Sequence, residues 1–146
     1  VDAYWSLGVI EHFFDGYTDI ADEMTRILRN KGYLFLTFPV MNGLRRLKVN
    51  LRMYDNFDNN KDNFYQYALN PKLVIKEFQK RGYEIILLKR NNGFKGLKDE
   101  SPSMLKGIFQ RIYDSEIFFN KLIGLILDKS LSFFCGHTIL IVLRKM

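Results

Sequence analysis

Residues 1–12 read V-D-A-Y-W-S-L-G-V-I-E-H, and this stretch decides the fold. Its beginning, residues 1–9, is almost continuously apolar, which is typical of a strand buried on both faces of a parallel sheet. The run ends in a small-residue turn and a Glu-His pair. Because ligands of open α/β sheets bind beyond the carboxyl ends of the strands, we expect Ser6, Leu7 and Gly8 to face a ligand crevice.

The residues that follow predict a helix and a second strand. Residues 18–30 carry apolar side chains at helical spacing, with acids in the first half and bases in the last turns, which suits the helix dipole. Gly32 is a typical stop signal. Residues 33–38, Y-L-F-L-T-F, then form an apolar run that Pro39 closes. A strand, a helix and a strand at this spacing predict a βαβ unit with parallel strands.

Further elements follow from the same kind of pattern. We expect a polar and basic loop over 41–67, a helix from Asn70-Pro71 to Gly82, a strand over 83–88, two helices within 103–133 and a last strand over 137–143. No repeat, linker or low-complexity tract is present in the sequence. The predicted organisation is therefore a single α/β domain over residues 1–146.

Composition limits the class of protein. The chain is 47% hydrophobic and 15% aromatic, which is typical of a folded globular protein. Its single cysteine, Cys135, excludes an internal disulfide and a zinc site built on several cysteines, and it fits a reducing compartment. No apolar run reaches the ~18 residues that a transmembrane helix requires. We therefore expect a cytoplasmic protein without a transmembrane segment.

The charge is unevenly distributed. The net charge is +6, with six acids and two bases in residues 1–30 and ten acids and twenty bases in residues 31–146. The densest basic group is Arg45, Arg46, Lys48 and Arg52. One interpretation is attraction to phosphate or an anionic surface, and the other is a solvated loop or helix face. No zinc-finger, RNA-recognition or homeodomain pattern accompanies these bases, so no specific nucleic-acid partner is expected.

Several motifs, taken in order, resemble a known family. D-A-Y-W-S-L-G-V-I-E-H, then E-M-T-R-I-L-R-N-K-G, then Y-L-F-L-T-F-P, is similar to the C-terminal half of a class I S-adenosylmethionine-dependent methyltransferase of the small-molecule, type 11 kind. The later F-Y-Q-Y-A-L-N-P, R-G-Y-E and H-T-I-L-I-V-L fit the same layout. The resemblance covers essentially residues 1–145 and lies in the order and spacing of the motifs.

The resemblance implies a fold and a cofactor. The fold is the C-terminal part of a Rossmann-like, seven-stranded sheet of mostly parallel strands, closed by residues 83–88 and 137–143, one of them antiparallel. The cofactor is S-adenosyl-L-methionine. The family's glycine-rich turn and ribose-binding acid are missing from the sequence. We therefore expect a partial domain that lacks the N-terminal half of the cofactor site and is inactive as an isolated fragment.

The same resemblance assigns the candidate site. It places Ser6, Leu7 and Gly8 against the methionine end of the cofactor through backbone contacts. His12 is the candidate base for an acceptor that must lose a proton, and the alternative is a structural role in the following turn. Some relatives bind a metal through a Glu that stands where this chain has Gly8. Glu11 and His12 alone are an incomplete ligand set, so we expect no metal.

Two further features keep two interpretations each, and a third gives a prediction. The aromatic residues could cover an acceptor pocket or could anchor a long loop; they are Tyr54, Phe57, Phe64, Tyr65 and Tyr67. Residues 117–127, with basic residues nearby, could contact a membrane surface or could pack on a sheet. The strand over 1–9 could become an exposed apolar edge, which predicts self-association of the chain.

Two functional hypotheses follow. The first is a methyltransferase that acts on a small-molecule, lipid or sugar acceptor. The second is a non-catalytic α/β module that binds a partner, or a degenerate methyltransferase fold.

Overall fold

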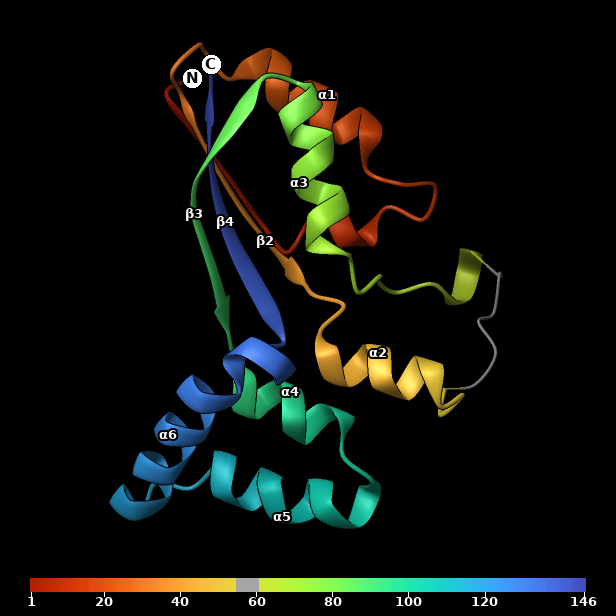
Figure 1. Cartoon of the computed structure of the whole chain (residues 1–146), viewed down its shortest axis with the longest axis vertical. Coiled ribbons are helices and arrows are strands. Elements are labelled where there is room, and N and C mark those ends of the chain that lie inside the picture. The colour runs from red at the N-terminus through yellow and green to blue at the C-terminus, as the bar shows by residue number, and fades with distance from the viewer. Residues whose placement is uncertain (55–60) are drawn as a thin grey trace. The chain divides into compact units, whose positions relative to one another are not determined.

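The structure is a computed structural model that describes residues 1–54 and 61–146 (Figure 1). The chain packs into two compact units, which are considered separately below. The first unit comprises Val1–Met41, Asn56–Lys89 and Ile139–Met146, and the second comprises Asn42–Asp55 and Arg90–Thr138. The expectation of a single domain over residues 1–146 stays a prediction.

One sheet organises the first unit. Its strands are β1 (Ala3–Leu7), β2 (Tyr33–Pro39), β3 (Tyr83–Asn91) and β4 (Thr138–Lys145), in the spatial order β1-β2-β4-β3. β1 and β2 are parallel, with Ala3 opposite Tyr33 and Leu7 opposite Thr37. The βαβ unit predicted from the sequence is confirmed.

β4 runs antiparallel to both of its neighbours. At its end, the backbone N–H of Lys145 donates to Gly32 at the start of β2 (3.0 Å). The N–H of Met146 donates to Gly82 just before β3 (2.8 Å). Figure 1 shows β4 rising toward the C-terminus between two descending strands. The predicted antiparallel closing strand is therefore confirmed.

Two helices cover one face of this sheet, α1 (Thr18–Ile27) and α3 (Pro71–Lys80) (Figure 1). Between helices and sheet lies the buried core, in which β2 and β4 alternate inward and outward side chains. It includes Ala21, Met24, Leu34, Leu36, Phe38, Val74, Phe78, Ile139, Ile141 and Leu143. Arg81, just after α3, pairs with Asp22 of α1 (2.7 Å). The periodicity of residues 18–30 thus correctly predicted the buried side of α1.

The other face of the sheet carries exposed apolar side chains. On β1 these are Trp5, 62% exposed, and Leu7, 54% exposed. The Trp5 ring stacks on Phe35 of β2 with ring centroids 4.0 Å apart. β1 is also an edge of the sheet that the described residues form. The apolar sequence predicted that β1 is buried on both faces, and this prediction is wrong.

The second unit contains four helices in its described residues: α2 (Gly43–Asn50), α4 (Gly93–Glu100), α5 (Ser103–Tyr113) and α6 (Phe118–Cys135). Glycines let α4 and α6 approach closely. A Cβ on Gly96 would stand 1.7 Å from the carbonyl oxygen of Cys135, and one on Gly93 would stand 2.4 Å from the backbone nitrogen of Ser132. The two helices therefore meet backbone to backbone.

The sequence missed two helices in this unit. Residues 41–67 were expected to form a loop, but α2 begins after Asn42, whose side chain accepts a hydrogen bond from Arg45 N (2.8 Å) as a helix N-cap. The helix was missed because the many basic residues of this segment made it resemble a polar loop, although Asn42 is a suitable N-cap and apolar residues follow it at helical spacing. α4 follows the Asn91-Asn92-Gly93 break, where Asn92 adopts a left-handed conformation at φ 60°.

Candidate functional site

The carboxyl end of β1 forms a tight turn. Leu7 is the last paired residue of β1, and the N–H of Gly8 donates to Thr37 O (3.0 Å). Gly8 then turns the chain with φ +69°, a left-handed conformation that favours glycine. A Cβ atom added to Gly8 would lie 3.5 Å from Glu11 Oε1, which is an ordinary contact distance. Glycine is therefore favoured here by the backbone angle and not by a lack of space.

Two polar side chains in this segment each bury one oxygen atom that has no hydrogen-bond partner. Ser6 is 1% exposed and Glu11, in the short 3₁₀ helix η1 (Ile10–His12), is 2% exposed. Neither Ser6 Oγ nor Glu11 Oε2 makes a hydrogen bond in the described structure. Burial raises the pKa of Glu11, and its own backbone N–H and His12 offset this in part. Buried polar atoms of this kind are unusual and call for a ligand or water.

His12 is held in a defined orientation. Its Nδ1 lies 2.7 Å from the carbonyl oxygen of Tyr65, and the two rings meet edge to face at 5.3 Å. A carbonyl oxygen can only accept, so Nδ1 carries the hydrogen of this bond. In a neutral imidazole the lone pair is then on Nε2, which suits the role of a base.

A segment distant in sequence crosses the ends of β1 and β2. Tyr67 N donates to Glu11 O (2.9 Å), and Leu69 N donates to Pro39 O (2.9 Å). The Phe64 ring packs on Phe14 at 5.2 Å. These contacts anchor the segment to the unit, as one interpretation of the aromatic set proposed.

The other members of the aromatic set predicted from the sequence do not all lie with this segment. Tyr54 belongs to the second unit, where its hydroxyl donates to Glu100 Oε2 (2.5 Å). Phe57 lies outside the described residues. The five residues therefore do not form one cover.

A pocket of about 450 Å³ lies beside His12. It is lined by His12, Phe13, Phe14, Asp15, Gly16, Asp19, Lys61 and Phe64. Lys61 pairs with Asp15 across an exposed part of the wall (2.6 Å). Aromatic walls with a few charged groups could take a small polar molecule with an apolar part.

The basic group predicted from the sequence is partly neutralised within the second unit. Glu100 accepts from Arg45 Nε (2.8 Å) and from Lys48 Nζ (2.9 Å). Burial acts to raise the pKa of Glu100, but the hydrogen bonds from Arg45, Lys48 and Tyr54 outweigh it, so this pKa lies below its usual value. For Arg45 and Lys48 this favours a structural role over phosphate binding.

His137 lies in the same polar cluster, which the sequence did not reveal. Its ring nitrogens face Arg45 Nη2 (3.2 Å) and Lys95 Nζ (3.3 Å). Burial, then Lys95 and Arg45, lower the pKa of His137 to about 4, and Asp99 and Glu100 oppose them. The imidazole is therefore neutral near pH 7. Residues 42 and 92 positions apart in the sequence meet here only through the tertiary structure.

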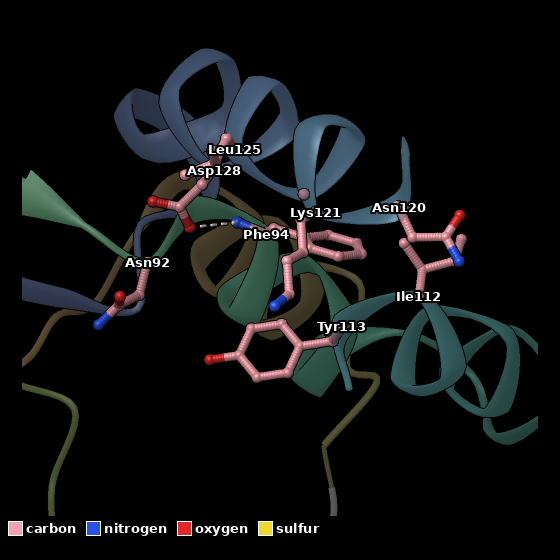
Figure 2. A pocket seen from close by; sticks show the side chains of 9 residues that line it. Asn92, Phe94, Ile112, Tyr113, Asn120, Lys121, Leu125 and Asp128 are labelled. Carbon is pink, nitrogen blue, oxygen red and sulfur yellow. Dashed lines mark hydrogen bonds between the residues drawn. The ribbon is translucent and has the colours of Figure 1, made fainter. Parts of the chain in front are cut away.

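A second pocket, of about 340 Å³, lies between the helices of this unit (Figure 2). Its lining is mainly apolar, with polar groups at intervals: Asn92, Phe94, Ile112, Tyr113, Asn120, Lys121, Gly124, Leu125 and Asp128. The Asp128 carboxylate accepts from Phe94 N (3.2 Å), the dashed bond in Figure 2.

Metal-ligating side chains do not converge in the part of the chain that the structure describes. No three of its His, Cys, Asp and Glu residues are grouped to hold a metal ion. The expectation that Glu11 and His12 bind no metal stays a prediction.

Solved structures similar to this one share a single fold. The chain matches a Bacillus halodurans protein assigned as a methyltransferase, with a TM-score of 0.53 and 16% identity over 99% of this chain and 69% of the other. It matches an S-adenosylmethionine-dependent methyltransferase of Archaeoglobus fulgidus at 0.52 and 12%, over 99% and 59%. It also matches a cyclopropane synthase of Mycobacterium tuberculosis at 0.53 and 14%, over 99% and 55%. No protein-family model and no curated protein matches the sequence.

These similarities define the fold and not the reaction. The chain has the α/β fold of the C-terminal part of class I methyltransferases, as the resemblance implied. It spans about half to two thirds of the length of the structures it matches. Identities of 12 to 16% over such lengths carry no argument about substrate.

Proposed function

We propose that this chain contributes one half of the cofactor site of an S-adenosylmethionine-dependent methyltransferase, whose acceptor is a small molecule, lipid or sugar. The observation that carries the proposal is the carboxyl end of β1. There a left-handed Gly8 follows an exposed Leu7, and Ser6 and Glu11 bury polar atoms that no group among residues 1–54 and 61–146 satisfies.

The residues present fit a sulfonium cofactor. The exposed backbone and side chain at Leu7 and Gly8 offer a flat apolar contact for the methionine end. Glu11 is a buried carboxyl without an ion pair among the described residues, and a nearby cation would favour its charged form. When bound, this cofactor supplies an electrophilic methyl group.

His12 would act on the acceptor. For a hydroxyl acceptor, the proton that the hydroxyl loses on methylation would pass to His12 Nε2. The Tyr65 carbonyl, which accepts from Nδ1–H, fixes that tautomer and would stabilise the resulting imidazolium. The pocket beside His12 is the proposed place for the acceptor.

The proposal is tested by titrating the ¹⁵N-labelled chain with S-adenosylmethionine and following backbone amide shifts, because this readout detects weak binding by a half-site. We expect shifts centred on Leu7 and Gly8. Gly8→Ala should reduce them at least several-fold. Gly82→Ala is the matched control, since Gly82 also has a positive φ, +82°, and no neighbour within 4 Å of an added Cβ.

Two results would contradict the proposal. One is an absence of shifts at Leu7 and Gly8 at saturating cofactor. The other is an equal effect of the two glycine variants, which would trace the change to backbone strain. Either result favours the second hypothesis, a non-catalytic α/β module.

A further inference from the structure

One side of α6 carries large apolar side chains that are largely exposed in the described structure, and one of them, Leu125, also lines the pocket of Figure 2. This outer face of α6 consists of Phe118, Leu122, Leu125, Ile126, Lys129 and Phe133, whose spacing places them in one stripe along the helix. Phe118 and Phe133 are each 81% exposed, and Leu125 is 69% exposed. Isolated exposed apolar residues are ordinary, but a continuous stripe of them marks an interaction surface.

The opposite side of α6 packs within its own unit. It lies against α4 at Gly93 and Gly96, where the backbones touch. Asp128, the one acidic residue of α6, also points inward and accepts a hydrogen bond from Phe94 N at the start of α4 (Figure 2). The outer face of α6 therefore contains no carboxylate.

The charge that remains on this face is positive. Lys129 lies within the stripe, and no ion pair involves it among residues 1–54 and 61–146. Neighbouring α5, in the same unit, carries two further cations that lack an ion pair in the described structure, Lys106 and Arg111. An apolar stripe that contains a lysine and no acid is complementary to a surface that is apolar inside and anionic outside.

The position of Lys129 argues against a second copy of the chain as the occupant. It lies well inside the 18-residue helix and not at either end. In a twofold interface formed through this face, both Lys129 ammonium groups would be drawn into the contact, where the face offers no carboxylate to pair with them. At a membrane, the flexible lysine stem can instead extend along the apolar stripe and place its charge among lipid phosphates.

We propose that the outer face of α6 binds the surface of an anionic phospholipid bilayer, with the helix lying in the interfacial plane. In the described part of the chain, no helix combines the length and apolar character needed to cross a bilayer. The proposal does not depend on the methyltransferase assignment, because it uses neither β1 nor His12.

The test is flotation of the full chain with vesicles of phosphatidylcholine, with or without phosphatidylglycerol. We expect binding to the anionic vesicles that weakens as salt rises, and much weaker binding to the neutral ones. Leu125→Ser should weaken binding about ten-fold, because it removes a large apolar side chain from the buried stripe. Leu73→Ser is the matched control, since Leu73 is a 62% exposed leucine on α3.

Charge is tested with a second pair of variants. Lys129→Glu should weaken binding to anionic vesicles about five-fold or more, and binding to neutral vesicles much less. Lys72→Glu, on an exposed part of α3, should leave both unchanged. Circular dichroism of all four variants checks that the helices remain folded.

Three outcomes would overturn the proposal. The first is failure to float with anionic vesicles at low salt. The second is an equal effect of Leu125→Ser and Leu73→Ser. The third is a dimer in sedimentation equilibrium that Leu125→Ser disperses, which would assign this face to a contact between copies.

Discussion

Replacing Gly96 by alanine should destabilise the second unit, although alanine is the better helix former. Gly96 lies inside α4, where propensity alone predicts that Gly→Ala stabilises by about 1 kcal/mol. The structure predicts the opposite sign. The new Cβ would stand 1.7 Å from Cys135 O, whereas about 3.0 Å is the practical minimum for such contacts.

The magnitude follows from what must move. The Cys135 carbonyl belongs to the backbone at the end of α6, so no side-chain rotation can relieve the contact. Separating the atoms requires a shift of about 1.3 Å between α4 and α6, and backbone shifts of this kind typically cost about 1–3 kcal/mol. We expect a loss near the upper end, about 3 kcal/mol, net of the gain in helix propensity.

Gly107→Ala is the matched control. Gly107 lies inside α5, in the same unit, and nothing lies within 4 Å of an added Cβ. This variant should gain about 0.5–1 kcal/mol from propensity. Urea unfolding followed by far-ultraviolet circular dichroism measures both variants against the unchanged chain. The reasoning is refuted if Gly96→Ala unfolds within about 0.5 kcal/mol of the unchanged chain, or if both glycine variants shift stability in the same direction.

The polar cluster of the second unit supplies two more predictions. The pKa of His137 is about 4 in the folded state, below the ~6.5 of an unfolded histidine. Between these two pH values the unfolded state binds more protons than the folded state. The free energy of unfolding therefore falls as the pH drops through this window. From about pH 7.5 to pH 5 the unchanged chain should lose about 1–2 kcal/mol more than His137→Gln in urea unfolding; equal losses would contradict the neutral, buried imidazole. Glu100→Gln removes the carboxylate that Arg45 and Lys48 share at 10% side-chain exposure, and it should cost about 3 kcal/mol at pH 7. A thermal melt unchanged by Glu100→Gln would show that these contacts contribute little.

The helices and strands of the first unit were largely predictable because each has a recognisable pattern within its own short segment. The apolar runs of β2 and β4, the periodic stripe of α1 and the Asn70-Pro71 start of α3 are each readable within one segment. Their order then predicts a parallel βαβ unit and an antiparallel closing strand. The position of Ser6, Leu7, Gly8 and His12 at the carboxyl end of β1 follows from the same local patterns. That this end faces a ligand stays a prediction.

The second unit was poorly predictable because its order comes from distant contacts. The Asn42 side chain caps α2 and also donates to the carbonyl oxygens of Cys135 (3.0 Å) and Gly136 (3.1 Å). Nothing near Asn42 in the sequence signals these partners. The cluster around His137, the second residue after α6, likewise brings together α2 and α4. From the local sequence, each cation of this cluster is predicted to be a solvated surface charge.

The sequence by itself determined the strands and helices of the first unit, the turn at Gly8 and the position of His12 after the first strand, because these depend on backbone preferences and on periodicity along one segment. Only the tertiary structure decided that Nδ1 of His12 carries the hydrogen, that Ser6 and Glu11 bury unsatisfied atoms, and that Gly96 is fixed by a neighbouring carbonyl. Those facts depend on which atoms of distant segments meet. Local propensity carries no information about such contacts, because they form only when the core excludes water and brings the segments together.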